Sequence, residues 1–185
     1  MKRISNICFG CEPLGGTDWG DVDVDAIDTA IHTALDLGIN FFDTAGVYGL
    51  GLSERRLSKI LGNRRYDVVI ATKGGLSWEK SGSRRSNIIK DSSPLAIRRD
   101  IENSLRRLRL ETLPIFYVHW PDISIQIEDT FIELSRQKNE GKIQSIGCSN
   151  FSAQQLKKAC SVSQVDYLQV PLSIISGELD DSISR

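Results

Sequence analysis

The 185-residue chain lacks long apolar runs and has no excess of charge of either sign. Its apolar stretches fall well short of the roughly 20 residues that span a bilayer, so we expect no membrane segment. The 23 Lys and Arg balance 24 Asp and Glu, which argues against a broad basic surface for nucleic acid and against an acidic tail. The N-terminus also lacks the apolar core of a secretory signal, so we expect a cytoplasmic protein.

Residues that commonly bind metals are scarce as well. There are only two histidines, His32 and His119, which argues against a metal hydrolase. Cys8 and Cys11 form a C-x-x-C pair, but no second Cys or His pair stands at zinc-site spacing. On a strand, positions three apart face opposite sides, so a thiol redox pair is disfavoured too. We expect no metal, and we expect the four cysteines to be buried thiols that act as small apolar groups.

Short apolar runs rich in β-branched residues alternate with amphipathic stretches along the whole chain. The runs predict strands within residues 4–9, 39–42, 68–72, 115–119, 143–148 and 167–170. Apolar residues spaced by three and four predict the intervening helices. About five β-α repeats followed by a sixth strand indicate a parallel sheet with right-handed crossovers. The sequence therefore predicts an α/β fold in one domain over residues 1–185.

Glycine, serine and proline mark the ends of the predicted helices. Three glycines fall just past helix ends, where a left-handed residue is favoured: Gly38, Gly62 and Gly141. Ser53 and Ser152 are predicted N-caps, and Ser93 before Pro94 is a typical helix start.

Two stretches bear on ligand binding. Residues 74–93 are polar and lack strong periodicity, which is typical of a lid or binding loop. A doubly wound dinucleotide-binding sheet needs a glycine fingerprint after its first strand. The glycines of 46–51 follow the second strand at the wrong spacing, so that alternative is rejected.

Polar residues follow the predicted strands at their carboxyl ends, which form the catalytic face of a β/α barrel. They are Asp43, Lys73, His119, Ser149 and Asn150, with Tyr48 five residues past Asp43. Taken singly, each has a structural explanation, such as a cap, a solvated lysine or a packed histidine. Together they suit one proton-transfer site. A lysine ammonium lowers the pKa of a tyrosine phenol, an aspartate holds the lysine, and a histidine orients a carbonyl or relays a proton.

Several ordered motifs resemble those of the aldo-keto reductase superfamily. The most distinctive are DTAGVYGLGLSE at 43–54, YVHWPD at 117–122 and GKIQSIGCSNF at 141–151. Together with shorter matches they cover nearly the whole chain in order. The resemblance implies a TIM-type (β/α)8 barrel that binds NADPH or, less often, NADH. It also implies a small-molecule carbonyl substrate: an aldehyde, a ketone or a sugar.

The resemblance further implies roles for individual residues. The catalytic tetrad would be Asp43, Tyr48, Lys73 and His119, with Tyr48 as general acid. The nicotinamide and its ribose would be held by Asp43, Ser149, Asn150 and Gln169. The substrate would contact Tyr48, His119 and Trp120, beside the 74–93 loop.

The chain departs from the family pattern in three places. Leu172 stands where an aromatic residue commonly stacks on the nicotinamide, and Cys11-Glu12 stands where many members have Thr-Trp. A complete barrel takes about 250 residues, so we expect an incomplete one with about six βα units. It would be a fragment, a remodelled barrel, or a homo-oligomer that pairs through its open edges. The alternative function is a non-catalytic or non-redox scaffold with weakened cofactor binding.

Overall fold

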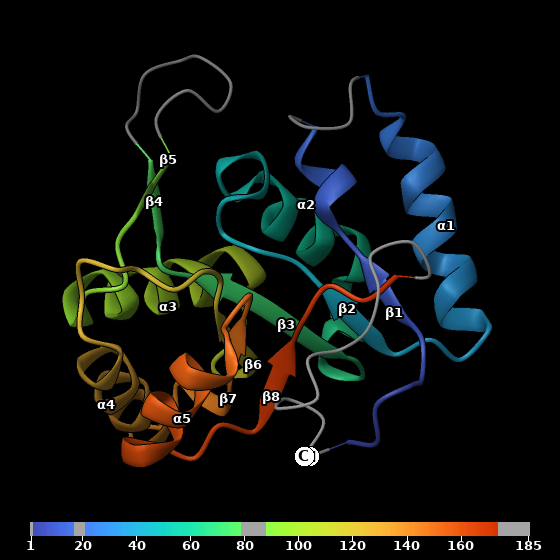
Figure 1. Cartoon of the computed structure of the whole chain (residues 1–185). Coiled ribbons are helices and arrows are strands. Elements are labelled where there is room, and N and C mark those ends of the chain that lie inside the picture. Colours follow the sequence, from blue (N-terminus) through green and yellow to red (C-terminus); the bar gives the residue numbers. More distant parts are fainter. Residues whose placement is uncertain (1, 17–20, 79–87, 174–185) are drawn as a thin grey trace.

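A computed structural model describes residues 2–16, 21–78 and 88–173. Six parallel strands form one curled sheet in the order β1-β2-β3-β6-β7-β8 (Figure 1). Their bounds are β1 Cys8–Gly10, β2 Phe41–Asp43, β3 Val69–Gly74, β6 Leu113–Val118, β7 Ile143–Ser149 and β8 Tyr167–Gln169. This arrangement is the incomplete barrel that the sequence predicts.

Helices connect the successive strands and cover the outside of the sheet (Figure 1). The α-helices are α1 Val24–Asp36, α2 Leu52–Leu61, α3 Pro94–Leu108, α4 Ile127–Asn139 and α5 Ala153–Val162. Short 3-10 helices are η1 Glu12–Gly15, η2 Tyr48–Gly51 and η3 Gly62–Tyr66. The predicted alternation of strands and helices is confirmed.

The alternation of side chains along each strand divides the core into two layers. Phe42, Ile70 and Phe116 point outward and are fully buried against apolar residues of the helices. Val69, Ala71, Ile115 and Tyr117 form a separate buried cluster, in which Tyr167 of β8 also packs. The polar residues of interest lie beyond this inner cluster, at the carboxyl ends of the strands.

The predicted helix starts are correct at two positions and wrong at the third. Ser93 accepts a hydrogen bond from the amide of Ala96, and Ser152 forms a complete capping box with Gln155. Ser53 is not an N-cap, because the left-handed Gly51 takes that position. The Ser53 hydroxyl is buried and instead donates to the Cys11 carbonyl at 2.7 Å. Ser53 therefore ties α2 to the end of β1.

The first strand is shorter than predicted. It begins at Cys8, and the residues before it are held by the side chain of Asn40 instead of by ladder hydrogen bonds. Asn40 accepts from the Ser5 amide at 2.8 Å and donates to the Arg3 carbonyl at 2.8 Å. The Asn40 side chain thus fixes the backbone of Arg3 and Ser5, which strand pairing was expected to fix.

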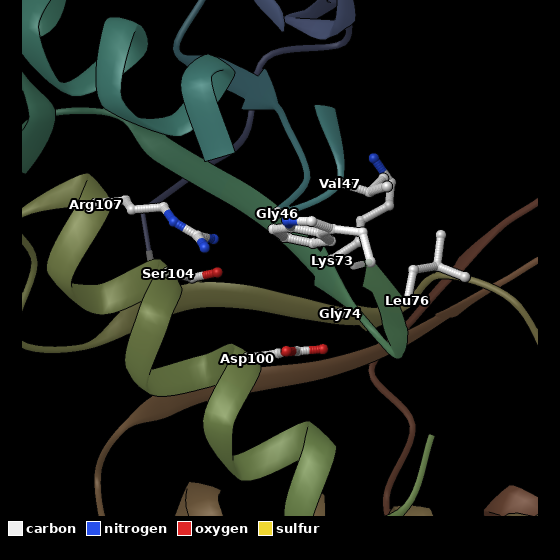
Figure 2. A pocket seen from close by; sticks show the side chains of 9 residues that line it. Gly46, Val47, Lys73, Gly74, Leu76, Asp100, Ser104 and Arg107 are labelled. Atoms are coloured by element: carbon white, nitrogen blue, oxygen red, sulfur yellow. The ribbon is translucent and has the colours of Figure 1, made fainter. Parts of the chain in front are cut away.

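The 74–93 stretch is more regular than predicted, since it contains an antiparallel hairpin. Its strands are β4 Leu76–Trp78 and β5 Ile88–Lys90, and the residues between them lie outside the described part of the chain. The Asp91 amide donates to the Gly75 carbonyl at 3.0 Å and closes the base. A small pocket separates β4 from α3 and from the loop after β2 (Figure 2).

The cysteine prediction is correct for two residues and wrong for two. Cys11 and Cys148 are buried, whereas Cys8 and Cys160 are exposed. Burial raises the pKa of the Cys148 thiol to about 12, so it stays protonated. Within the described residues there is no cluster of three or more metal-ligating side chains, and no helix is long and apolar enough to cross a membrane.

The sheet has two outer strands, β1 and β8. In the described sheet β1 pairs with β2, and β8 pairs with β7. The end strands of an open sheet are templates for pairing with another chain. We therefore expect the 185-residue chain to elute as a dimer or larger assembly in size-exclusion chromatography with light scattering. A monomer that persists at high micromolar concentration would contradict this prediction.

Candidate active site

Parallel pairing brings the first two polar residues to the same edge of the sheet. Asp43 is the last residue of β2, and Lys73 lies near the end of the adjacent β3. In register Asp43 faces Ala71, so Lys73 extends two residues farther and its side chain reaches the Asp43 carboxylate.

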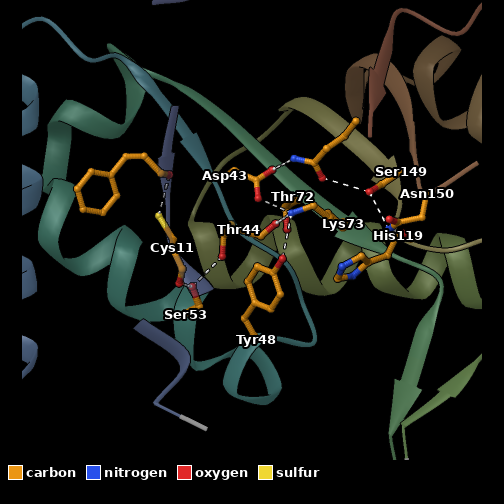
Figure 3. Close-up of polar contacts among 12 residues, drawn as sticks. Cys11, Asp43, Thr44, Tyr48, Ser53, Thr72, Lys73, His119, Ser149 and Asn150 are labelled. Atoms are coloured by element: carbon orange, nitrogen blue, oxygen red, sulfur yellow. Dashed lines mark hydrogen bonds and ion pairs between the residues drawn. The ribbon is translucent and has the colours of Figure 1, made fainter. Parts of the chain in front are cut away.

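The Lys73 ammonium group is at the centre of the site (Figure 3). It donates hydrogen bonds to the Asp43 carboxylate, to the Thr44 carbonyl at 3.1 Å and to the Tyr48 hydroxyl at 3.3 Å. The three donors of the ammonium group thus have three acceptors. Lys73 is 2% exposed. Burial alone would lower its pKa, but the charge of Asp43, the Tyr48 phenol and the hydrogen bonds to both together outweigh burial, and the pKa is raised. Lys73 is therefore a permanent cation.

Tyr48 is placed by close packing of two backbone segments. It begins η2, which lies against η1 of the β1–α1 connection. A Cβ on Gly49 would come within 2.2 Å of the Gly15 carbonyl oxygen, and one on Gly15 within 2.6 Å of the Gly49 nitrogen. Gly49 also has a φ of +58°. Only glycine allows both the approach and the turn.

The Tyr48 phenol is subject to opposing influences. Burial raises its pKa above 10, the charge of Lys73 lowers it, and the charge of Asp43 raises it again. The net direction is upward, so Tyr48 is protonated at neutral pH. Lys73 moderates the cost of removing that proton because it stabilises the phenolate. Tyr48 has the state that a general acid requires before the reaction.

His119 follows β6 and packs its ring edge-on against Tyr48, with 5.7 Å between ring centroids. Its amide donates to the Gly74 carbonyl at 2.9 Å, which fixes the backbone beside β3. Burial and the nearby Lys73 lower its pKa to about 3, so the imidazole is neutral. Its Nδ1 atom is buried without a hydrogen-bond partner among the described residues. A neutral imidazole can donate one hydrogen bond without adding charge.

Three further side chains connect to this group from the next two strands. Gln169 of β8 donates to the Asp43 carboxylate at 3.2 Å, and Ser149 of β7 donates to Gln169 at 3.2 Å. Asn150 donates to the His119 carbonyl at 3.0 Å. The left-handed backbone of Asn150, with φ of +62°, turns its amide back toward the strand ends. All three residues that sequence reasoning placed beside the tetrad are close to it.

Two further residues that the sequence analysis singled out, Trp120 and Leu172, are exposed and lie at the rim of the site, after the carboxyl ends of β6 and β8. Trp120 is 42% exposed and its ring is 5.2 Å from the Lys90 ammonium of the hairpin. This contact places β5 of the hairpin beside Trp120, while a ligand-binding role of the 74–93 stretch stays a prediction. Leu172 is 63% exposed.

Sequence reasoning missed a polar layer behind the site. Glu54 of α2 is fully buried and accepts from the Thr72 hydroxyl at 2.7 Å and from Arg107 of α3 at 2.9 Å. One signal was available, because Glu54 shares a helix face with the apolar Leu57 and Leu61. A charge on an apolar face needs a buried partner. No sequence pattern identifies that partner on another helix.

The fold and the site define an α/β barrel with a lysine-paired tyrosine at the carboxyl ends of its strands. The aldo/keto reductase family model matches residues 6–182. Aldo-keto reductase YhdN of Bacillus subtilis is 34% identical over 183 residues, 98% of this chain and 54% of the relative. The NADH-specific methylglyoxal reductase of Escherichia coli is 32% identical over 91% of this chain and 55% of its own. The chain belongs to the aldo/keto reductase family.

Solved structures agree with this family and with the fold. The glycerol dehydrogenase AKR11B4 of Gluconobacter oxydans has a TM-score of 0.84 at 39% identity, over 91% of this chain and 52% of its own. Aldo-keto reductase AKR11C1 of Bacillus halodurans, in its holo form, has a TM-score of 0.82 at 31% identity, over 92% and 54%. The chain thus spans about half the length of the relatives it matches, and its fold is an incomplete (β/α)8 barrel of the aldo-keto reductase kind.

The contact between η1 and η2 gives a testable prediction. Gly49→Ala adds a methyl group at a positive φ and directly against Gly15. Left-handed backbone costs alanine about 1–2 kcal/mol, and overpacking adds about 1–3 kcal/mol. Urea denaturation should show a loss of stability of about 2–5 kcal/mol.

Gly141→Ala is the matched control for this prediction. Gly141 has a φ of +77°, and nothing lies within 4 Å of a Cβ built there. Only the backbone cost of about 1–2 kcal/mol should appear. Equal losses in the two variants would mean that the approach of Gly15 does not constrain the Tyr48 loop.

Proposed function

We propose that this chain is an NAD(P)H-dependent reductase that converts an aldehyde, ketone or sugar carbonyl to an alcohol. The observation that carries the proposal is the buried Lys73 ammonium shared by Asp43 and Tyr48. Such a group has little structural value on its own, because a buried charge costs more than the apolar side chain it replaces. It is explained by the need for a tyrosine that can release a proton near neutral pH.

The proton step follows from the charges in the site. Reduction of a carbonyl leaves negative charge on its oxygen, which must be protonated as it forms. Tyr48 donates its hydroxyl proton to that oxygen, and Lys73 stabilises the phenolate that remains. Asp43 keeps Lys73 charged and in place. A positioned general acid of this kind contributes roughly 10²–10⁴-fold to the rate.

His119 is proposed to orient the carbonyl. Its ring lies against the Tyr48 ring, and its low pKa keeps it neutral. A neutral imidazole donates one hydrogen bond to the carbonyl oxygen and does not compete with Tyr48 for the role of acid. Trp120, at the rim beside the hairpin, is proposed to contact the rest of the substrate.

The residues at the strand ends fit a nicotinamide. A carboxamide needs both donors and acceptors, and the side chains of Ser149, Asn150 and Gln169 offer both within one hydrogen-bonded chain. Asp43, which Gln169 already contacts, is proposed to approach the ribose. When bound, the dihydronicotinamide supplies the hydride, which no side chain can provide. The cofactor is proposed as NADPH or NADH, and one relative is named NADH-specific.

A second candidate is a scaffold that binds a ligand without redox chemistry. It is favoured by Leu172, which is exposed where an aromatic residue commonly stacks on the nicotinamide. Loss of that stacking is worth about 1 kcal/mol, roughly a fivefold weaker affinity. That loss is too small to abolish binding, and the scaffold does not account for the buried Lys73. The reductase is therefore the better proposal.

The proposal predicts that binding and turnover separate on substitution. Tyr48→Phe should reduce kcat for a generic aldehyde by about 10²–10⁴-fold, and Lys73→Met should reduce it at least as much. Both variants should still bind NADPH or NADH in a nicotinamide fluorescence titration, because neither side chain is proposed to hold the cofactor. Absence of saturable binding by the native chain at millimolar cofactor would favour the scaffold.

The pKa of His119 predicts the shape of the pH–rate profile. Because that pKa is lowered to about 3, His119 stays neutral as pH falls through the usual histidine range near 6.5. The rate should therefore show no acid limb there. It should fall only at high pH, as Tyr48 loses its proton. An acid limb near pH 6.5 that disappears in His119→Gln would show that His119 titrates normally.

A further inference from the structure

A buried ion pair lies on the outer side of β3, directly behind the site. The Glu54 carboxylate accepts from Thr72, the residue before Lys73, and from the Arg107 guanidinium. Glu54 is fully buried and the Arg107 side chain is 17% exposed. The pair joins α2 and α3 to the strand that carries Lys73.

The same guanidinium packs against the loop that carries Tyr48. A Cβ on Gly51 would come within 2.5 Å of Arg107 Nε, and one on Gly46 within 3.4 Å of Arg107 Nη1. These glycines lie on either side of Tyr48. Arg107 therefore supports that loop at both ends, and the absence of side chains at 46 and 51 allows the contact.

Arg107 also contacts the hairpin. Its guanidinium carbon lies 5.6 Å from the centre of the Trp78 ring on β4, within range of a cation–π interaction. Figure 2 shows Arg107, Ser104 and Asp100 along α3, facing Gly46 and Lys73 across the pocket that Trp78 also lines. Asp100 accepts from the Gly75 amide at 2.9 Å and holds the hairpin base. One side chain thus contacts the catalytic loop, the catalytic strand (through Glu54) and the hairpin.

We propose that Arg107 is a positioning residue that couples the β4–β5 hairpin to the Tyr48–Lys73 pair. The hairpin borders the predicted substrate rim through Lys90 and Trp120. A displacement of Trp78 would shift the Arg107 guanidinium. That group packs against the loop of residues 46–51, which sets the distance from Tyr48 to Lys73. Tyr48 is therefore aligned with Lys73 only when Trp78 of the hairpin packs against Arg107. This inference rests on the proposed function, because it assigns Arg107 a part in positioning the proton donor. Its test does not require catalytic activity.

The test follows the Tyr48 phenol directly, without cofactor or substrate. Protein labelled with 13C at tyrosine Cζ is titrated by NMR, and Tyr48 is the resonance missing from Tyr48→Phe. Three variants are compared with the native chain: Arg107→Lys, Trp78→Leu, and the double variant Glu54→Gln/Arg107→Met. The double variant removes both buried charges together, so neither is left unpaired.

We expect the phenol to ionise at higher pH in all three variants. A cation within contact range lowers the pKa of a neighbouring acid by about 1–3 units. A weaker contact between Lys73 and Tyr48 should therefore raise the pKa of Tyr48 by about one unit. Trp78→Leu should give the smallest shift. In turnover assays kcat should fall by up to about tenfold for each unit, with KM for the cofactor unchanged. If the native chain proves inactive, the NMR shift still supports the coupling while the proposed function fails.

Arg106→Met is the matched control. Arg106 is the exposed neighbour of Arg107 on α3, and among the described residues its hydrogen bonds stay within α3, at the Glu102 carbonyl and the Asn103 side chain. It should titrate as the native chain does. The inference is overturned if folded Trp78→Leu titrates as the native chain does, or if folded Arg107→Lys and the double variant do. It is equally overturned if they lose stability without any shift of the Tyr48 resonance.

Discussion

The structure depends on one buried cation. The Lys73 ammonium is buried and hydrogen-bonded to a carboxylate, a carbonyl and a phenol. Removal of a charge from water costs several kcal/mol unless close partners replace the hydration. Asp43 and Thr44 lie at the end of β2 and Tyr48 begins η2, so the fold must bring β2, β3 and the loop after β2 together before the charge is compensated. Much of the described architecture at the carboxyl ends of the strands serves this requirement.

His119 and Tyr48 share the same surroundings, yet the electrostatics of the site shifts their pKa values in opposite directions. Burial lowers the pKa of His119 and raises that of Tyr48, because it favours the neutral form of each. Lys73 adds to the first effect and opposes the second. The result is an imidazole that stays neutral and a phenol whose pKa is raised less than burial alone would raise it. A single cation therefore assigns different roles to two neighbouring rings.

The sequence predicts the strands and helices well because they follow from periodicity, which is a local property. Asp43, Lys73 and His119 were also found, since residues that end adjacent parallel strands meet at one edge. Ser53 shows where this reasoning fails: its hydroxyl looks like an N-cap, but Gly51 supplies the turn and a buried carbonyl takes the hydrogen bond. The hairpin was missed because its short strands lie in a polar stretch without strong periodicity, whereas the equally short β1, β2 and β8 lie in apolar runs. The Glu54–Arg107 pair was missed because it joins residues 53 positions apart.

The contact between Gly15 and Gly49 has a consequence for the history of the site. Where side chains hold a loop, exchange of one side chain can be compensated by a change in its partner. Here two backbones touch, so there is no side chain to alter on either segment. Substitution is then sterically blocked at both glycines, whereas the exposed Trp120 of the rim has no such constraint. The position of Tyr48, the proposed proton donor, is therefore fixed by backbone while side chains around it can change.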